Sequence, residues 1–140
     1  MLSKTADYAL RAVVWLARSP GEALGAEQLA EATQTPRRYL RKVLQDLIKA
    51  GLVRSQPGPG GGYSLRCDTE QIKVLDVVNA VGSIDRIRSC PLGIEAHNTL
   101  CPLHRELDKI YAATEQAFSR LSVAQLLKEP SEVAPLCKIG

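Results

Sequence analysis

The chain is poor in aromatic residues, because its 140 residues include only one Trp, one Phe and four Tyr. A core of this composition has to be built from Leu, Val, Ile and Ala, which favours packed helices over a β-sandwich. Long apolar runs are also missing, since the stretch from Ala12 to Ala17 is far too short to cross a bilayer. We therefore expect a cytoplasmic protein without a signal peptide or a membrane partner.

The residue sets of common enzymes are missing as well. No Ser/His/Asp or Cys/His/Asn set occurs in a convincing order, and no pair of carboxylates stands out. The glycine-rich run at residues 57–62 lacks the Gly-Lys-Ser/Thr ending of a phosphate-binding loop. These absences favour a binding protein over an enzyme.

Apolar residues recur at helical spacing in six segments, which predicts helices over residues 4–18, 26–33, 36–50, 72–81, 103–121 and 122–127. In the third helix, Thr35 is expected to be the N-cap, Pro36 the first residue and Gly51 the stop signal. Leu52–Gln56 and Tyr63–Arg66 predict two short strands around a glycine-rich hairpin tip. The expected fold is mostly α with a small β-hairpin wing, a winged helix-turn-helix followed by a long dimerisation helix.

Four regions follow from this pattern. We expect a DNA-binding domain at residues 1–82, a Cys/His sensor loop at 83–102, a dimerisation helix with a short following helix at 103–128, and a tail at 129–140. The apolar face of the long helix exceeds what a small domain can cover, which predicts a homodimer.

Positive charge is concentrated between Thr35 and Arg66, where seven basic residues accompany a single acidic residue, Asp46. Such a segment suits a polyanion, and basic side chains in the first turns of a groove-binding helix meet bases and phosphates. Glycines in the wing would let the backbone approach the minor groove. The expected contacts with double-stranded DNA are Thr35, Arg37, Arg38, Tyr39, Arg41, Lys42, Arg54, Gly60, Gly61 and Gly62. The alternative is a winged helix that docks an acidic protein.

Both histidines and two of the four cysteines lie close together in the sequence. Cys90, His97 and Cys101 lie in the sensor loop, and His104 lies at the start of the long helix. In a reducing compartment such a cluster indicates a metal or redox site more than a structural disulfide. No C-x-x-C pair is present, so a structural zinc ion would need all four residues. A metal centre, a reversible disulfide and idle thiols all stay open. Cys67 and Cys137 stand alone and are expected to be incidental thiols.

Three stretches of the chain resemble the Rrf-type winged-helix regulators, a family that includes iron–sulfur and nitric-oxide sensors. Leu2–Ala12 is similar to the family's N-terminal signature, Gly51–Tyr63 to its wing, and Cys90–His104 to its cluster-binding loop. The resemblance implies a DNA-binding transcriptional regulator that senses redox state, nitric oxide or iron–sulfur status. It also implies an iron–sulfur cluster, of either the two-iron or the four-iron type.

The resemblance also implies a ligand set. Cluster-binding members carry three cysteines in this loop, and Cys90 and Cys101 match the outer two by position. His97 stands near the place of the missing middle cysteine, and His104 looks like a histidine ligand of the family. Asp7 matches an acidic ligand that reaches the loop from the first helix of the partner subunit. Other members hold no cluster, so a cluster-free thiol switch or a zinc site is the alternative.

Overall fold

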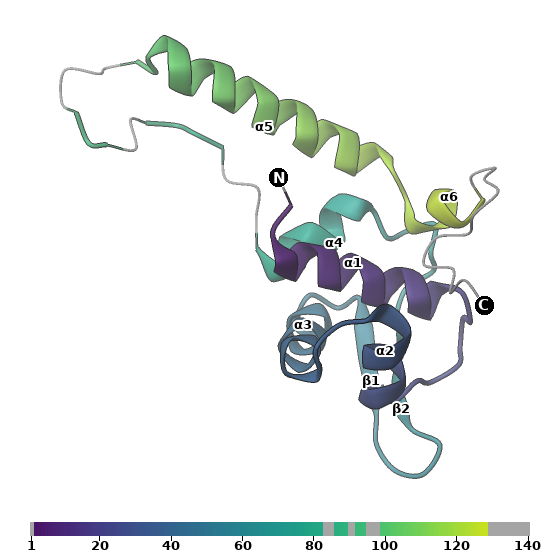
Figure 1. Cartoon of the computed structure of the whole chain (residues 1–140). Helices are drawn as coiled ribbons and strands as arrows, with labels where there is room; N and C mark the ends of the chain where they lie inside the picture. Colours follow the sequence, from purple (N-terminus) through teal and green to yellow (C-terminus); the bar gives the residue numbers. More distant parts are fainter. Residues whose placement is uncertain (1, 83–85, 90–91, 95–98, 129–140) are drawn as a thin grey trace.

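The computed structural model describes residues 2–82, 86–89, 92–94 and 99–128. Its elements, in chain order, are α1 (Lys4–Ala17), α2 (Ala26–Thr33), α3 (Arg37–Lys49), β1 (Val53–Gln56), β2 (Gly62–Leu65), α4 (Val74–Val81), α5 (Pro102–Arg120) and α6 (Val123–Lys128). Figure 1 shows α2, α3 and the β1–β2 hairpin on one side, α1 and α4 in the middle, and α5 along the opposite side. The expected mostly helical fold with a hairpin wing is confirmed.

The core is built around α1, α2 and α3, and Val77 of α4 completes it. The Ser3 hydroxyl caps α1 by accepting a hydrogen bond from the Ala6 backbone N–H at 3.1 Å. Apolar residues three or four positions apart on each helix form one inward stripe. The largest fully buried side chains of these helices are Val13, Leu16, Leu29, Leu40, Val43, Leu44 and Leu47. This packing fixes α3 against α1 and leaves the other face of α3 exposed.

The turn between α2 and α3 differs from the prediction by one residue. Thr35 is not the N-cap of α3, because Pro36 takes that position with an extended ψ of 133° and the helix begins at Arg37. The Thr35 side chain is only 4% exposed, and its hydroxyl lies 2.9 Å from that of Thr33. Gln34 adopts a left-handed conformation with a φ of 52°, which ends α2. The Thr35 hydroxyl therefore stabilises the turn from inside.

β1 and β2 form an antiparallel hairpin, the wing, with Val53 opposite Leu65 and Gln56 opposite Gly62. The strands are shifted slightly from the prediction, because Leu52 and Arg66 lie outside them. These two residues still extend the pairing, since the Arg66 N–H donates to the Leu52 carbonyl at 2.9 Å. The segment before α2 also joins the hairpin through the bridge between Leu24 and Tyr63.

α4 begins at Val74, two residues later than predicted, because residues 72–73 pair with the chain that follows α5. The Val123 N–H donates to the Ile72 carbonyl and the Val74 N–H to the Leu121 carbonyl, both at 2.8 Å. This pairing anchors the C-terminal end of α5, which begins and ends one residue before the predicted bounds. No helix in the described part of the chain combines the length and apolar content needed to cross a membrane.

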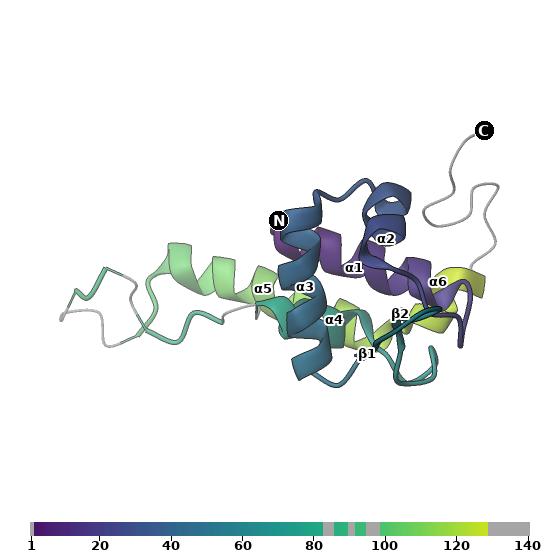
Figure 2. The ribbon, with the colours of Figure 1, turned by 90° about the horizontal axis from the view of Figure 1, so that it is seen from below.

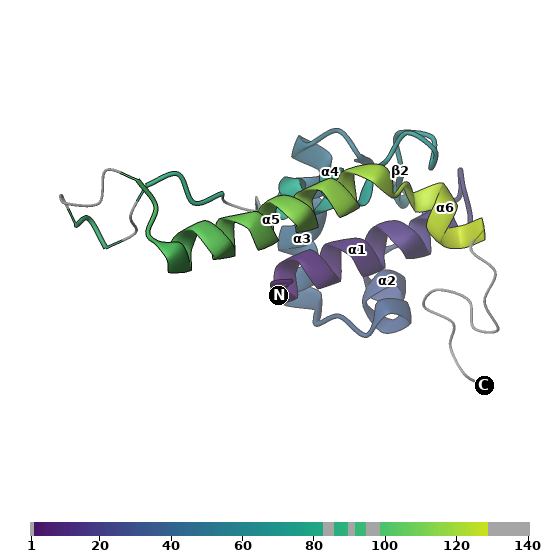
Figure 3. The ribbon, with the colours of Figure 1, turned by 90° about the horizontal axis from the view of Figure 1, so that it is seen from above.

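α5 is long and barely packed. Only its last turn reaches a buried cluster, where Phe118 and the following Leu121 contact Val74 and Val78. None of its described side chains is buried. Figure 3 shows the first half of the helix extending beyond α1 and α4.

Candidate nucleic-acid interface and sensor loop

The exposed face of α3 carries four cations near its N-terminus, and Figure 2 shows this helix in full view beside the wing. Two of these cations are neutralised within the chain. Arg37 pairs with Glu27 of α2 at 2.7 Å, and Lys42 pairs with Asp46 one turn later at 3.1 Å. Both cations are exposed, and the Arg37–Glu27 pair is exposed on both sides, so it contributes little to stability and can be exchanged for a phosphate at small cost.

Arg38 and Arg41 make no ion pair with any residue that the structure describes. Together with Arg37 they line a shallow hollow at the start of α3. Both side chains are exposed, so their charge is directed to solvent. These two guanidinium groups are the strongest candidates of the predicted set for contact with an anion.

Tyr39 is held at the surface by α1. Its ring lies 6.1 Å from the ring of Tyr8, measured between centroids, and the Arg38 guanidinium stands 5.1 Å from the Tyr39 centroid. The Arg38 side chain also donates a hydrogen bond to the Tyr39 hydroxyl at 3.2 Å. No local sequence pattern points to this role of Tyr8, because it depends on the packing of α1 against α3. This packing keeps Tyr39 and Arg38 in one orientation.

The predicted wing contacts divide into two kinds. Arg54 on β1 is exposed, and its Nε donates to the Ser64 hydroxyl on β2 at 3.2 Å, which orients the guanidinium across the hairpin. Gly60 has a φ of 73° and open space around the position of a Cβ. It therefore lies at the exposed tip, where a backbone can approach a ligand.

Gly61 and Gly62 are required to be glycine by the packing of the wing. A Cβ on Gly61 would lie 2.1 Å from the Gln56 carbonyl oxygen. A Cβ on Gly62 would lie 2.5 Å from the Leu24 carbonyl oxygen, at a φ of 145°. The glycine run thus serves the close packing of the wing as well as any approach to DNA, a requirement that the local sequence pattern did not reveal.

In the sensor loop, the structure brings Cys101 and His104 together. Cys101 is the N-cap of α5 and His104 lies in the first turn, so the Cys101 Sγ is 3.3 Å from the His104 Nδ1. The proline at the first helical position sets this turn. Cys90 and His97 lie outside the described residues, as does Cys137. Among the described residues, no group of three or more His, Cys, Asp or Glu side chains could hold a metal ion.

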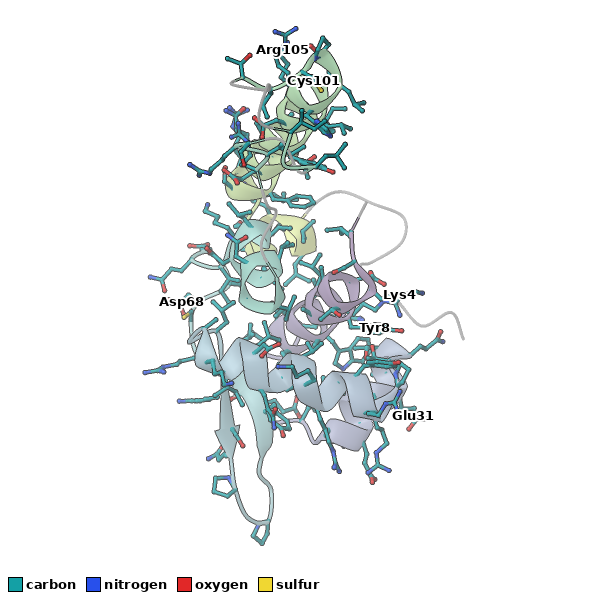
Figure 4. All side chains as sticks on the ribbon, turned by 90° about the vertical axis from the view of Figure 1, so that its left-hand side faces the viewer. Lys4, Tyr8, Glu31, Asp68, Cys101 and Arg105 are labelled. Carbon is teal, nitrogen blue, oxygen red and sulfur yellow. The ribbon has the colours of Figure 1, made fainter. Side chains whose placement is uncertain are left out.

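Asp7 lies on a different part of the same subunit. Its carboxylate pairs with Arg11 at 2.7 Å, and Arg11 in turn donates to the Thr33 carbonyl at the end of α2 at 3.2 Å. Figure 4 shows the first turns of α1, marked by Lys4 and Tyr8, well separated from Cys101 and Arg105 at the start of α5. Asp7 therefore does not join Cys101 and His104 within one subunit.

Cys67 is partly buried just after the wing, where its thiol contacts the Gly51 carbonyl at 3.4 Å. That this thiol is incidental stays a prediction.

The comparisons with known proteins agree with the fold. The Rrf2 family, described as iron-dependent transcriptional regulators, matches residues 2–129. The regulator NsrR of Bacillus subtilis is 28% identical over 145 residues, which cover 99% of this chain and 97% of that protein.

Solved structures of regulators share the same architecture. IscR of T. potens matches 94% of this chain and 89% of its own with a TM-score of 0.76 at 25% identity. CymR of B. subtilis, described as the global cysteine regulator, has the same TM-score over 94% of this chain and 98% of its own at 24% identity. This protein is thus a DNA-binding regulator and not an enzyme, and its chain belongs to the Rrf2 family of transcriptional regulators.

Proposed function

We propose that the protein is a homodimeric regulator that reads double-stranded DNA with α3 and the wing. In this proposal the Cys/His sensor loop holds an iron–sulfur cluster that alters DNA binding. The observation that carries the DNA part is the pair of uncompensated guanidinium groups, Arg38 and Arg41, on the exposed face of a helix that is rigidly packed on its other side.

The roles of the two arginines differ. Arg38 is held by the Tyr39 ring and hydroxyl, so it enters a groove already oriented, which reduces the entropy lost on binding. Arg41 lies one turn further along α3, where it can donate hydrogen bonds either to a guanine edge or to a phosphate. Arg54 is proposed to add a contact from the strand of the wing, and the open backbone at Gly60 one from its tip.

The DNA proposal is tested by Arg41→Ala, with Lys49→Ala at the opposite end of α3 as the matched control. Fluorescence anisotropy on an operator selected from random sequences measures affinity over a series of salt concentrations. We expect Arg41→Ala to weaken binding about tenfold or more and to lower the salt slope by about one. Lys49→Ala should leave both nearly unchanged. Equal affinities for wild type and Arg41→Ala would contradict the proposal.

The dimer part of the proposal rests on α5. Leu103 and Ile110 are 64% and 48% exposed, and they lie on the same helical face as Leu107 and Tyr111. Exposed apolar faces of this kind mark an interface. A second copy of the chain is the proposed occupant, because α5 of each subunit supplies the same face and a two-fold arrangement buries both.

The sensor part of the proposal starts from Cys101 and His104. A thiolate and an imidazole nitrogen in contact can bind one metal ion without a large rearrangement. The family's description as iron-dependent supports iron over zinc. The proposed ligands are Cys90, Cys101 and His104, with His97 or Asp7 of the partner subunit as the fourth. When bound, the cluster supplies a centre that reacts to redox change or nitric oxide.

Asp7 offers a route from the sensor loop to the DNA-binding helices. Arg11 links the Asp7 carboxylate to the end of α2, directly before the turn into α3. A cluster that takes Asp7 as a ligand would compete with this ion pair. We propose that this competition shifts the orientation of α2 and α3. DNA affinity can respond to the cluster only if the forms with and without it differ in this way.

The cluster proposal is tested by the iron and sulfide content of protein purified without oxygen. We expect bound iron and sulfide in the wild type and a marked loss in His104→Ala. Cys67→Ala is the matched control, because its thiol lies beside Gly51 and outside the loop. If His104→Ala keeps its iron and its redox response, His104 is not a ligand. If the wild type holds no iron and its thiols form a Cys90–Cys101 disulfide, the cluster-free alternative holds.

A further inference from the structure

A single carboxylate on α5 ties down the chain that leads into the sensor loop. Asp108 accepts hydrogen bonds from Nε and Nη2 of Arg86, both at 2.7 Å, and from the backbone N–H of Ile87 at 2.9 Å. The side chain of Asp108 is 17% exposed, and that of Arg86 is 36% exposed. Two parallel bonds from a guanidinium fix direction as well as distance, so this contact is more specific than an ordinary surface pair.

The contact stays charged at neutral pH. The pKa of Asp108 lies below its usual value, chiefly because Arg86 donates hydrogen bonds to the carboxylate. Desolvation opposes this shift, and smaller contributions from the Ile87 N–H and from the charges of Arg86 and Arg88 lower the pKa further. The pKa of Arg86 is raised by the same hydrogen bonds. The described groups therefore favour an ionised pair throughout the neutral range.

Asp108 lies on the same face of α5 as the candidate ligands. Cys101, His104 and Asp108 are spaced by three and four residues, which places them one above another along the helix. The Cys101 Sγ and the His104 Nδ1 already touch at 3.3 Å. The clamp, by which we mean Arg86, Ile87 and Asp108, is thus aligned with the ligand-bearing turn.

The spacing of the two segments also matches. Figure 1 shows the segment containing residues 86–89 running outward while α5 runs back, so the two are antiparallel. Three residues separate Ile87 from Cys90, so the chain between them spans at most about 10 Å. From Asp108 back to Cys101, the helix axis also covers about 10 Å. Cys90 lies outside the described residues, but its covalent link to the clamp keeps it within that reach of Ile87.

We propose that Arg86 and Asp108 are positioning residues, which set the register of the sensor loop against α5 so that Cys90 meets Cys101 and His104. This inference rests on the proposed role of the loop as the sensor. It assigns to the clamp no contact with the metal. Loss of the clamp removes the tether that lies three residues before Cys90, and the two cysteines then meet less often.

The test measures how readily the two cysteines meet in protein that holds no metal. Apoprotein is equilibrated with mixtures of reduced and oxidised glutathione, in which the two protein thiols form a disulfide while one oxidised glutathione yields two reduced molecules. Mass spectrometry of the Cys90–Cys101 peptide gives the effective concentration of one thiol at the other. We expect Asp108→Ala to lower it about tenfold, because the tether three residues before Cys90 is then lost.

Arg86→Gln provides a second variant that leaves the sequence of α5 intact, and it should lower the effective concentration in the same direction. Lys109→Gln is the matched control, because it removes an exposed ion pair with Glu106 on the same helix without touching the clamp. Circular dichroism verifies that each variant keeps its helices. Effective concentrations in Arg86→Gln and Asp108→Ala equal to that of Lys109→Gln would overturn the proposal.

The iron content of the same variants separates this proposal from the function on which it rests. If the wild type binds iron but the clamp variants keep both the wild-type iron affinity and the wild-type effective concentration, the positioning role is wrong and the cluster stands. If the clamp variants lose effective concentration while the wild type binds no iron, the cluster is wrong and the clamp still positions a thiol pair.

Discussion

The winged helix and α5 differ in how far each buries its apolar residues. In α1 to α3, Leu16, Leu29 and Leu40 are at most 1% exposed, and they pack on one another across helices. In α5, Leu103 is 64% exposed and no described side chain is buried. The first region is stable through its own core, whereas the described residues leave the apolar face of the second uncovered.

The largest expected effect is the loss of stability caused by a substitution in the winged-helix core. Leu40→Ala removes a fully buried side chain and should lower the free energy of unfolding by about 3 kcal/mol, from lost burial and the cavity left behind. Ile110→Ala on α5 should act mainly by weakening the dimer. Urea unfolding at several chain concentrations distinguishes them, because only Ile110→Ala should reduce the dependence of stability on concentration. Equal behaviour of both variants would remove the difference between the two regions.

Within the wing, two glycines sharpen the comparison between packed and open positions. Gly62→Ala brings a Cβ within 2.5 Å of the Leu24 carbonyl oxygen, so the hairpin has to move away from the segment before α2. We expect it to lower the free energy of unfolding by about 2 kcal/mol or more. Gly60→Ala meets no atom within 4 Å and should cost about 1 kcal/mol, the strain of its positive φ alone.

Urea unfolding of the two wing variants checks this order, and DNA binding adds a second measurement. Gly62→Ala should weaken DNA binding together with stability, because the whole hairpin shifts. A larger loss of stability in Gly60→Ala than in Gly62→Ala would contradict the packing account of the glycine run.

The smallest expected effect is the pH dependence of the stability that the clamp contributes. Because the pKa of Asp108 is lower in the folded protein than its usual value, the ionised carboxylate stabilises the fold above the usual Asp pKa. This stabilisation is lost as the pH falls through the lowered value. The difference in unfolding free energy between wild type and Asp108→Asn should therefore be largest near neutral pH and shrink in acid. Urea unfolding at a series of pH values measures it, with Glu106→Gln as the control for removing a carboxylate from α5. A difference that grows in acid would contradict the assignment.

Much of the winged helix could be predicted from the sequence, because its signals are local. The helical spacing of Leu40, Val43, Leu44 and Leu47 predicted the buried stripe of α3, and Gly51 marked the end of that helix. The bounds of α2 agree with the prediction at both ends. The prediction of Thr35 as N-cap was wrong, because its hydroxyl bonds to that of Thr33 within the turn.

The features that could not be predicted depend on residues far apart in the chain. The bridge between Leu24 and Tyr63 gives Gly62 its role, and no local pattern reveals it. The same holds for the delayed start of α4, which follows from pairing with the chain after α5. Arg86 and Asp108 lie 22 residues apart and read in isolation as ordinary surface charges. The predicted DNA contacts and metal ligands remain predictions.

The difference between the two regions is tested most directly by sedimentation velocity of the whole chain. We predict a dimer for the wild type and a monomer for Ile110→Glu, which places a charge on the exposed apolar face of α5. Gln116→Glu, on the opposite face of the helix, should remain a dimer, and circular dichroism should find the helices kept in both variants. A wild type that sediments as a monomer, or an Ile110→Glu variant that stays a dimer, would contradict the account that α5 is covered by a second copy.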